Sequence, residues 1–591
     1  MSRDLPRNLR GSRVIVHIDL DCFYCQVEQV RRGVPTHVPA AVQQWQGLIA
    51  VNYAARAAGV TRHANIEDAR KACPEIQLLH VATYAENETE WKYHARPSRA
   101  THKVSLDPYR EASKKIFTIF KRHCDTVQKI GLDECFMDLT ETVNELMTKR
   151  YPTAALAADD DLCDQPIDWN KLGVTIASED ESERRRQLDN DVDADHEEES
   201  WRDPATWQDL QLAIGAELAA AIRQEIYDEL SYTCSAGIAH NKVVAKLCSS
   251  KNKPNKQTIL RHCATAAFMR DTPFTKIRNL GGKLGTEVET ELNIDKAGDL
   301  WKYTVNDLQQ RFGESTGLWL YNVARGIDNE EVTVTKAPKS IMASKSFRPP
   351  VKSSEEMQRW FATLAAELHT RMMLNFDEFD AWPKTLTIHY RSTQDTTYRT
   401  RSCAMPRRTD LTSPDKLAQR AIILFGKAED ALPCVGLSLN AVAMQSSQTV
   451  GNHSISEFFK QGAKEVARMS GETPPRSASP SPQSSMHDNG ESGNSRSQKS
   501  AGILAYLNAP QSSNSTHSSD PNKWMCDKCH KNIPINKVDE HTDYHFALDL
   551  QAEDRGSASP STSPSTKRKS EDPPATVQKS SKYLFFQRRS Q

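Results

Sequence analysis

The sequence predicts an α+β multidomain fold with a compositionally biased C-terminal part. Apolar β-rich runs such as VIVHIDL at 14–20 indicate strands. Residues 215–230 indicate a helix with one buried face, because apolar side chains recur there every four positions, at Leu218, Ile222, Ile226 and Leu230. Beyond about residue 460 the composition changes to Ser, Pro, Gln, Gly and Asn. A chain of 591 residues holds several domains.

The composition gives a net charge of -1 with 26% charged residues. This average hides segregation, because acidic residues concentrate at 159–161 and 179–199, and local charge decides whether a surface binds phosphate. Thirteen cysteines are scattered through a chain with no secretory leader and no bilayer-spanning apolar run. We therefore expect reduced thiols, a cytosolic or nuclear setting and no membrane partner.

Two short carboxylate clusters interrupt apolar β-rich runs. Asp19 and Asp21 lie in VIVHIDLDCFY, and Asp133 and Glu134 lie in QKIGLDECFMDLT. An ionised carboxylate is costly to bury in such a run unless a cation or hydrogen-bond donors balance it. Carboxylates are hard oxygen donors that suit magnesium, manganese or calcium, and a pair of such ions supports phosphoryl transfer. A single cluster of this kind fits a helix cap or a turn equally well.

Further motifs follow the first cluster in a fixed order. IAVNYAARAAGVTR stands at 49–62, and CSAGIAHNKVVAKLCSSKNKPNKQTIL stands at 234–260. Together with the carboxylates, these motifs resemble the Y-family translesion DNA polymerases, most closely the eta type, over about 450 residues. The resemblance implies a right-hand polymerase whose parts are a palm (1–22 and 99–262), fingers (23–98), a helical thumb (263–335) and a little finger (336–448).

The resemblance also implies roles for single residues. Asp19, Asp133 and Glu134 are the implied catalytic ligands of two magnesium ions, with the Leu20 carbonyl as a further ligand. Tyr24 stands where the family keeps an aromatic gate against the ribose 2′-hydroxyl. The remaining implied contacts are to the incoming nucleotide and the template base: Tyr53, Arg56 and Lys253 at the triphosphate, Gln43 and Arg62 at the bases.

Local physical chemistry constrains these assignments. Arg56 and Arg62 are six positions apart, so one helix does not present both on one face. Adjacent Asp133 and Glu134 point to opposite faces of a regular strand, so both are ligands only at a strand end or a bend. Gly131 permits that bend. We expect the lysines of the 234–260 motif other than Lys253 to be solvated or near phosphate rather than catalytic: Lys242, Lys246 and Lys251.

Other segments indicate contacts to a nucleic acid backbone. Gly281 and Gly282, followed by Lys283, suit a hairpin that offers backbone N–H groups to a phosphate, although an ordinary helix C-cap is the alternative. In TLTIHYRS at 385–392, alternation predicts a half-buried strand. The implied little finger contains basic candidates for phosphate contacts, of which several are expected to be merely solvated: Lys339, Lys345, Arg348, Arg391 and Arg399. The acidic stretch 151–204 is read as a surface insertion, with a regulatory element as the alternative.

The C-terminal part contains a metal-binding pattern beyond a linker at 449–521. Cys526, Cys529, His541 and His545 have the spacing Cys-x2-Cys-x11-His-x3-His, which predicts one structural zinc in a small ββα finger at 522–551. Acidic residues on the helix of the finger disfavour DNA. The stretch DEHTDYHFALDLQ resembles a ubiquitin-binding zinc finger, which implies ubiquitin as partner and Asp543 as a contact.

Two short peptides resemble sliding-clamp ligands. NHSISEFF at 452–459 matches the pattern Q-x-x-I-x-x-F-F with Asn452 in place of glutamine, so Ile455, Phe458 and Phe459 are its anchors. In the tail at 552–591, Phe585 and Phe586 form a looser version, and Lys567 to Lys569 form a weak nuclear import signal.

The predicted function is DNA-directed DNA synthesis past damaged template bases, such as cyclobutane pyrimidine dimers, without proofreading. The expected partners are primer–template DNA, deoxynucleotides, ubiquitin and the ubiquitinated sliding clamp, with a monomeric enzyme in the nucleus. Two alternatives stay open: a Y-family polymerase of kappa or iota type, and a non-catalytic adaptor that binds ubiquitin and the clamp. The adaptor has no need of the carboxylates.

Overall fold

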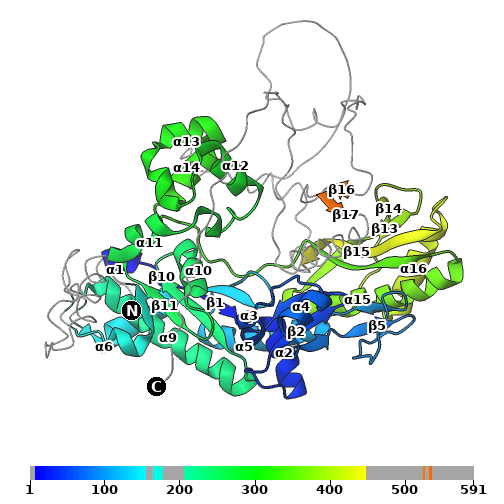
Figure 1. Cartoon of the computed structure of the whole chain (residues 1–591), viewed down its shortest axis with the longest axis horizontal. Helices are drawn as coiled ribbons and strands as arrows, with labels where there is room; N and C mark the ends of the chain where they lie inside the picture. Colours follow the sequence, from blue (N-terminus) through cyan, green and yellow to red (C-terminus); the bar gives the residue numbers. More distant parts are fainter. Residues whose placement is uncertain are drawn as a thin grey trace, which may run out of the picture. The chain divides into compact units, whose positions relative to one another are not determined.

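The computed structural model describes residues 7–152, 154, 163, 165–176 and 205–446, together with the backbone of 523–525 and 532–534 (Figure 1). The chain divides into two compact units, 1–556 and 557–591, and every described residue belongs to the first. Within the described part, no helix is long and apolar enough to cross a membrane.

A six-stranded central sheet has the strand order β7-β8-β1-β10-β11-β9. Its strands are β1 (Ile15–Leu20), β7 (Val127–Lys129), β8 (Glu134–Asp138), β9 (Val174–Ile176), β10 (Cys234–Ala239) and β11 (Gln257–Leu260). β1 pairs antiparallel with both β8 and β10, whereas β11 pairs parallel with β10 and β9. The sheet is therefore antiparallel at its centre.

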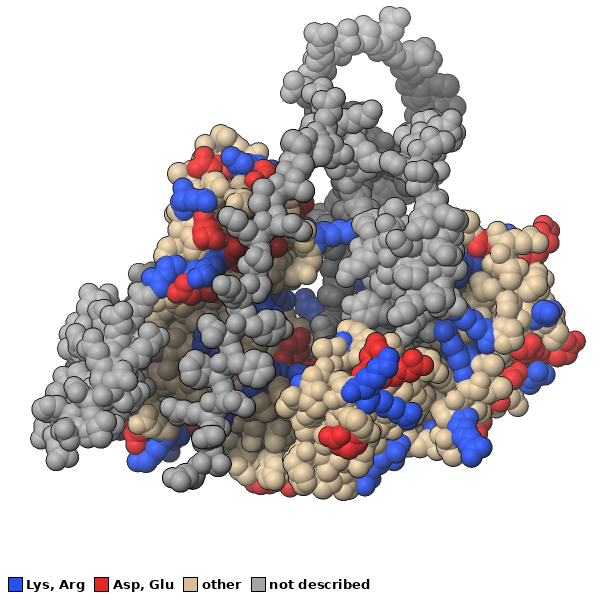
Figure 2. Space-filling model, in the orientation of Figure 1, with Lys and Arg blue, Asp and Glu red and all other residues tan. Residues whose placement is uncertain are grey.

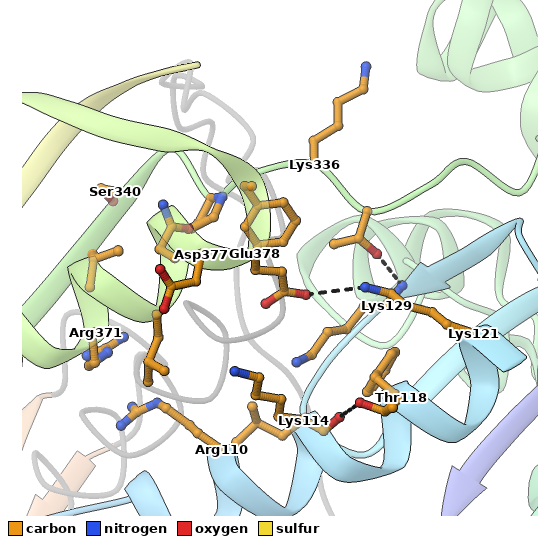
Figure 3. Close-up of a pocket in the computed structure, with 18 residues that line it drawn as sticks. Arg110, Lys114, Thr118, Lys121, Lys129, Lys336, Ser340, Arg371, Asp377 and Glu378 are labelled. Carbon is orange, nitrogen blue, oxygen red and sulfur yellow. Dashed lines mark hydrogen bonds and ion pairs between the residues drawn. The ribbon is translucent and has the colours of Figure 1, made fainter. Parts of the chain in front are cut away.

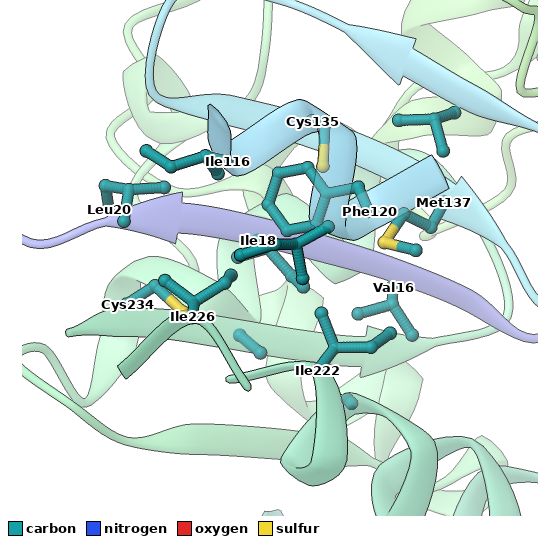
Figure 4. Packing of buried hydrophobic residues seen from close by; sticks show 14 of the residues in the cluster. Val16, Ile18, Leu20, Ile116, Phe120, Cys135, Met137, Ile222, Ile226 and Cys234 are labelled. Carbon is teal, nitrogen blue, oxygen red and sulfur yellow. The ribbon is translucent and has the colours of Figure 1, made fainter. Parts of the chain in front are cut away.

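Helices cover both faces of the central sheet. They are α1 (Arg7–Gly11), α2 (Phe23–Arg32), α5 (Asp107–His123), α6 (Thr140–Arg150), α7 (Trp169–Leu172), α9 (Trp207–Leu230) and α10 (Lys242–Lys251). Because β1 alternates, Val16, Ile18 and Leu20 face the core formed with α5 and α9 (Figure 4). Ile15 belongs instead to the core that includes α10, on the opposite face.

The helix predicted at 215–230 is the C-terminal part of α9. This helix begins earlier, at Trp207, because Thr206 and Asp209 form a capping box. Ile222 and Ile226 are fully buried, whereas Leu218 and Leu230 at either end are partly buried against the same core. The predicted buried face is therefore confirmed at its centre, and its two end residues are less buried than its central ones.

A smaller sheet, in the order β3-β2-β4, follows α2 in the chain. Its elements are β2 (Ala40–Gln44), β3 (Gly47–Val51), α3 (Tyr53–Ala57), α4 (Ile66–Ala72) and β4 (Gln77–His80). It has its own core, built around Leu48, Val51 and Val60. Two further strands, β5 (Thr83–Ala85) and β6 (His102–Val104), pair antiparallel beyond it.

Residues 262–323 contain helices, whereas the helical part is predicted to continue to residue 335. The elements are η3 (His262–Ala264), α11 (Thr265–Asp271), η4 (Phe274–Lys276), α12 (Lys283–Leu292), η5 (Ala297–Lys302), α13 (Val305–Phe312) and α14 (Glu314–Val323). Gly282 is the N-cap of α12 and makes no side-chain capping bond. The alternative of a helix C-cap at this glycine pair is therefore wrong, and the first N–H groups of α12 lack a side-chain acceptor.

A four-stranded antiparallel sheet, in the order β12-β15-β13-β14, forms the last large part. Its elements are β12 (Ser340–Val351), α15 (Ser354–Phe379), β13 (Ala381–Ser392), β14 (Arg399–Ala404), α16 (Pro414–Gly426) and β15 (Cys434–Ser446). Leu386, Ile388 and Tyr390 of β13 are buried under α15 and α16, which confirms the alternation predicted for TLTIHYRS.

Near the C-terminus, β16 (Lys523–Met525) pairs antiparallel with β17 (Asn532–Pro534). The four predicted zinc ligands, Asp543 and both clamp-like peptides lie outside the described residues.

Gly237 lets α10 approach the central sheet closely. A Cβ atom at this position of β10 would overlap the carbonyl oxygen of Ala245 and the amide of Ser249. We expect Gly237→Ala to lower the free energy of unfolding by about 2 to 3 kcal/mol, because the helix must move away. Urea denaturation measures this loss. Gly11→Ala is the control, since no heavy atom lies within 4 Å of a Cβ there, and equal stability of the two variants would contradict this account of the packing.

Candidate active site

The paired ends of β1 and β8 bring the predicted catalytic carboxylates together. Asp19 is the register partner of Glu134, so both side chains project from the same face of the sheet. Asp133 lies in the bend directly before β8, and the Leu20 amide donates to its carbonyl oxygen at 2.9 Å. The expectation that the adjacent pair lies at a strand end is thus confirmed.

Each of two carboxylates lies against a lysine. The Lys253 ammonium is 2.5 Å from Asp19 Oδ1, and the Lys246 ammonium is 2.5 Å from Glu134 Oε2. Among the residues that the structure describes, no three His, Cys, Asp or Glu side chains are gathered as a metal centre. The donor set nevertheless fits divalent cations, because hard oxygens on paired strands already attract positive charge here. A bound cation would take the place of the lysine ammonium groups beside these carboxylates.

Glu134 is held ionised by its surroundings. Burial opposes its ionisation, but the neighbouring His17 and Lys246 outweigh burial and keep the pKa of this carboxyl well below its usual range. His17 is fully buried, with Nε2 3.5 Å from Glu134 Oε2 and Nδ1 2.7 Å from the Ser249 hydroxyl. Burial lowers the pKa of His17, which favours the neutral imidazole. Sequence reasoning did not identify this histidine.

Asp21, the second aspartate of the first cluster, has a structural role. It is 1% exposed and accepts hydrogen bonds from the hydroxyls of Ser235 at 2.8 Å and Thr233 at 3.0 Å. It also accepts from the backbone amide of Asn255 at 2.8 Å. Because Asn255 follows the Lys253–Pro254 turn, Asp21 holds the loop from which Lys253 reaches Asp19.

Tyr24 lies near the start of α2 in a rigid aromatic arrangement. Its ring stacks on that of Tyr109 with 4.0 Å between centroids and 15° between planes. The Tyr109 hydroxyl donates to buried Glu28 at 2.9 Å, and the Tyr93 hydroxyl donates to the same oxygen at 2.9 Å. Arg31 donates to the other oxygen of Glu28 at 2.7 Å. The position of Tyr24 therefore depends on residues that no local pattern in the sequence connects.

The predicted triphosphate contacts gather around Cys22. The Arg56 guanidinium lies 4.7 Å from the Tyr53 ring centroid, and its Nε donates to the Val51 carbonyl at 2.9 Å. Burial raises the pKa of the Cys22 thiol to about 12, while the charges of Arg56 and Lys253 oppose this rise. Arg56 is thus held against Tyr53 and the C-terminal end of β3.

Gln43 and Arg62 both attach to the β2–β3 hairpin. Gln43 donates from Nε2 to the Trp45 carbonyl at 2.7 Å, and Arg62 donates from Nε to the Ile49 carbonyl at 3.0 Å. Arg56 belongs to α3, which ends at Ala57, so the two arginines do come from separate segments.

The expectations for several lysines need correction. Lys242 is not solvated: its side chain is fully buried and its ammonium pairs with Glu330. Lys246 contacts a predicted catalytic carboxylate, as described above, whereas Lys251 is exposed. Lys345 is 5% exposed and donates to the Arg99 carbonyl at 2.6 Å. It therefore links two parts of the fold and is not an exposed candidate for a phosphate contact.

The remaining basic candidates for phosphate contacts are less buried. Arg399 pairs with Asp395 at 2.5 Å, and Arg391 lies 5.5 Å from the Tyr398 ring centroid. On the face shown in Figure 2, blue basic and red acidic side chains are interleaved over the described surface. Phosphate binding here therefore depends on local groups rather than on one continuous basic field.

Four family models match parts of this chain. The model described as impB/mucB/samB family matches residues 18–250, and its C-terminal domain model matches 338–452. A model described as DNApol eta/Rev1, HhH motif matches 272–327, which includes Gly282 and α12. A Ubiquitin-Binding Zinc Finger model matches 522–553.

Curated relatives cover much of the chain. It is 33% identical to N-acetyltransferase eso1 of Schizosaccharomyces pombe, over 92% of this chain and 62% of that protein. It is 34% identical to DNA polymerase eta of Arabidopsis thaliana, over 67% of this chain and 56% of that protein. It is 30% identical to DNA polymerase eta of Saccharomyces cerevisiae, over 65% of this chain and 68% of that protein.

The chain thus spans less than two thirds of the length of the first two relatives. The acetyltransferase activity in the name of the first relative is not assigned to this chain. The family models that match this chain describe polymerase and zinc-finger modules. From the ordered family matches and the relative in Saccharomyces cerevisiae, the chain belongs to the Y family of DNA polymerases and is similar to its eta type.

Proposed function

We propose that this protein is a DNA-directed DNA polymerase that extends primers opposite damaged template bases, including cyclobutane pyrimidine dimers. The observation that carries the proposal is the pairing of Asp19 with Glu134, beside Asp133 and the Lys253 ammonium. Carboxylates next to cationic side chains suit a reaction between a hydroxyl and a triphosphate.

In the proposed reaction the primer 3′-oxygen attacks the α-phosphorus of a deoxynucleoside triphosphate. A new phosphorus–oxygen bond forms, the bond to the β-phosphate oxygen breaks, pyrophosphate leaves and the hydroxyl proton is released. Two magnesium ions, when bound, would be held by Asp19, Asp133, Glu134 and the Leu20 carbonyl and would stabilise the attacking and leaving oxygens. No proofreading step is part of the proposal.

The side chains of this protein divide the remaining work. Lys253 and Arg56 neutralise the triphosphate, and Tyr53 supports the guanidinium of Arg56. Tyr24 excludes the 2′-hydroxyl of a ribonucleotide. Gln43 of β2 contacts the template base, and Arg62, which follows α3 and donates to the Ile49 carbonyl of β3, contacts the incoming base.

We assign the parts of the fold accordingly. The central sheet with its helices is the palm, the small sheet is the fingers, residues 263–335 are the thumb and 336–448 are the little finger. The exposed start of α12 at Gly282 and Lys283 suits a DNA backbone phosphate. The stretch 151–204 is a palm insertion, and 449–521 is a linker.

The C-terminal modules are assigned to recruitment. A zinc ion held by Cys526, Cys529, His541 and His545 organises the finger, which binds ubiquitin through Asp543. The peptides with Ile455, Phe458 and Phe459, and with Phe585 and Phe586, bind the sliding clamp. We place the enzyme in the nucleus as a monomer that recognises ubiquitinated clamp.

The lesion assignment is tested against the kappa and iota types by primer extension. Extension across a thymine dimer should be clearly better than across an abasic site, because the eta type accommodates both linked bases. Equal extension across the two lesions would favour a kappa-like or iota-like enzyme instead.

Replacing Asp133→Asn together with Glu134→Gln should lower single-turnover primer extension by more than about 100-fold. Calcium binding to the protein, measured by calorimetry, should weaken in parallel. Asp125→Asn with Glu145→Gln is the control, because both carboxylates are exposed and distant in sequence from β1. If the first double variant kept both activity and calcium binding, the metal assignment would be wrong, and the adaptor would become the better hypothesis.

Tyr24→Ala should raise the ratio of ribonucleotide to deoxynucleotide incorporation, compared as kcat/KM, by about tenfold or more. The physical reason is that the alanine variant lacks the Tyr24 ring, which stacks on Tyr109 and is expected to block the 2′-hydroxyl. Tyr24→Phe is the matched variant, since it keeps the ring and should keep the ratio. A ratio that rises equally in both variants would sink the gate assignment.

Asp543→Ala should weaken ubiquitin binding by about tenfold or more while primer extension stays at the wild-type level. Fluorescence anisotropy with labelled ubiquitin measures the first quantity. Asp549→Ala, six residues further along, is the control for charge alone. Unchanged ubiquitin binding in Asp543→Ala would remove this residue from the interface.

A further inference from the structure

A pocket of about 350 Å³ lies between α5 and the segment that begins the last sheet (Figure 3). Its walls come from α5, from Lys129 of β7, from residues 335–341 and from the C-terminal end of α15. Its volume falls in the range of about 300 to 1,000 Å³ that ligand sites occupy. Nothing in the proposed polymerase reaction uses this pocket.

The pocket carries an excess of positive charge. Six basic side chains line it, compared with two acidic ones, Asp377 and Glu378. The basic residues are Arg110, Lys114, Lys121, Lys129, Lys336 and Arg371. In Figure 3 the side chains of Lys114 and Lys129 extend into the space between α5 and α15.

Internal partners account for only part of this charge. Arg110 pairs with Asp107 at 2.7 Å, and Arg371 donates to the Met342 carbonyl at 2.6 Å. Lys121 lies 3.8 Å from Glu378, and both side chains are well exposed, so this pair is weak. Lys114 and Lys336 are exposed, and neither has an ion-pair partner among the described residues.

The floor of the pocket is apolar. Phe117 and Leu132 belong to the core under α5, and Ile341 belongs to the core of the last sheet. Leu374 adds an apolar side chain that is 41% exposed. The Lys129 ammonium lies 4.6 Å from the Phe117 ring centroid, so positive charge stands directly over the apolar floor.

The pocket lies behind the central sheet with respect to the candidate active site. α5 packs on the face of β1 that carries Val16 and Ile18. Asp19 shares the other face with His17, which hydrogen-bonds to Ser249 of α10. The charges of Lys114 and Lys336 are therefore not needed to neutralise the triphosphate at Asp19.

We propose that this pocket binds an acidic peptide segment of a partner protein, with carboxylates at Lys114, Lys121 and Lys336 and an apolar side chain against Phe117 and Leu132. The acidic residues at the rim favour a peptide over nucleic acid. Asp377 and Glu378 accept hydrogen bonds from peptide N–H groups, and a sugar–phosphate backbone has no such donors.

The chain's own acidic residues at 179–199 are the less favourable occupant. Their segment leaves the central sheet after β9, whereas Lys129 belongs to β7. These two strands are the opposite edges of the six-stranded sheet. The acidic residues at 179–199 would have to extend from one edge of the sheet to the other to fill the pocket, whereas a partner protein would not.

The test measures binding of a fluorescein-labelled ten-residue peptide, with six glutamates and two leucines, to the full-length protein by anisotropy. We expect saturable binding that weakens as salt rises. Lys114→Glu with Lys336→Glu should weaken it at least tenfold, and Leu374→Gln should weaken it severalfold. Lys115→Glu with Lys352→Glu is the matched control, because both lysines are exposed and neither lines the pocket.

Primer extension on undamaged DNA separates this proposal from the polymerase assignment, and it should be unchanged in the pocket variants. The proposal is overturned if charge reversal leaves peptide binding intact, or if a ten-nucleotide single strand competes for the pocket as well as the peptide does. It is also overturned if deleting 179–199 tightens peptide binding tenfold, since the chain itself then fills the pocket. If primer extension and peptide binding were both lost in the charge-reversal variant, these lysines would instead be contacts to the DNA substrate.

Discussion

The structure depends on one constraint, namely that carboxylates at the ends of buried strands need positive charge beside them. The antiparallel pairing of β1 with β8 sets Asp19 against Glu134, so two negative charges share one face of the central sheet. Lys253 forms an ion pair with Asp19, and Lys246 forms one with Glu134. Both lysines lie in segments that follow β10 in the chain. The strand register brings the carboxylates together, and the lysines balance their charge where burial would otherwise be costly. We propose that nucleotides react at this point.

Two groups that take no part in the chemistry set the position of these lysines. Gly237 lets α10 lie close against β10, which brings Lys246 to Glu134. Asp21 accepts the amide of Asn255 and so fixes the loop that carries Lys253. A buried carboxylate and a missing side chain thus determine where two partly buried cations lie, which explains why the site is assembled from four separate parts of the chain.

Prediction succeeded where the determining pattern is local. Alternation in TLTIHYRS correctly gave a strand with Leu386, Ile388 and Tyr390 inside, and the adjacency of Asp133 and Glu134 correctly required a bend before the strand. It failed for Lys242 and Lys345, because their burial depends on partners such as Glu330 and the Arg99 carbonyl that lie far away in the sequence. His17 and Tyr109 gave no signal for the same reason.

By itself, the sequence determined the family and the order of the matched modules, and it located the two carboxylate clusters, because residue types and their spacing carry that information directly. The tertiary structure alone decided which cation faces which carboxylate, that Asp21 is saturated by donors, and that Tyr24 rests on Tyr109 and Glu28. It also decided that basic residues of α5 and the segment before β12 enclose one pocket. Such contacts join residues 81 or more positions apart in the chain, and only the packing of sheets and helices brings them together.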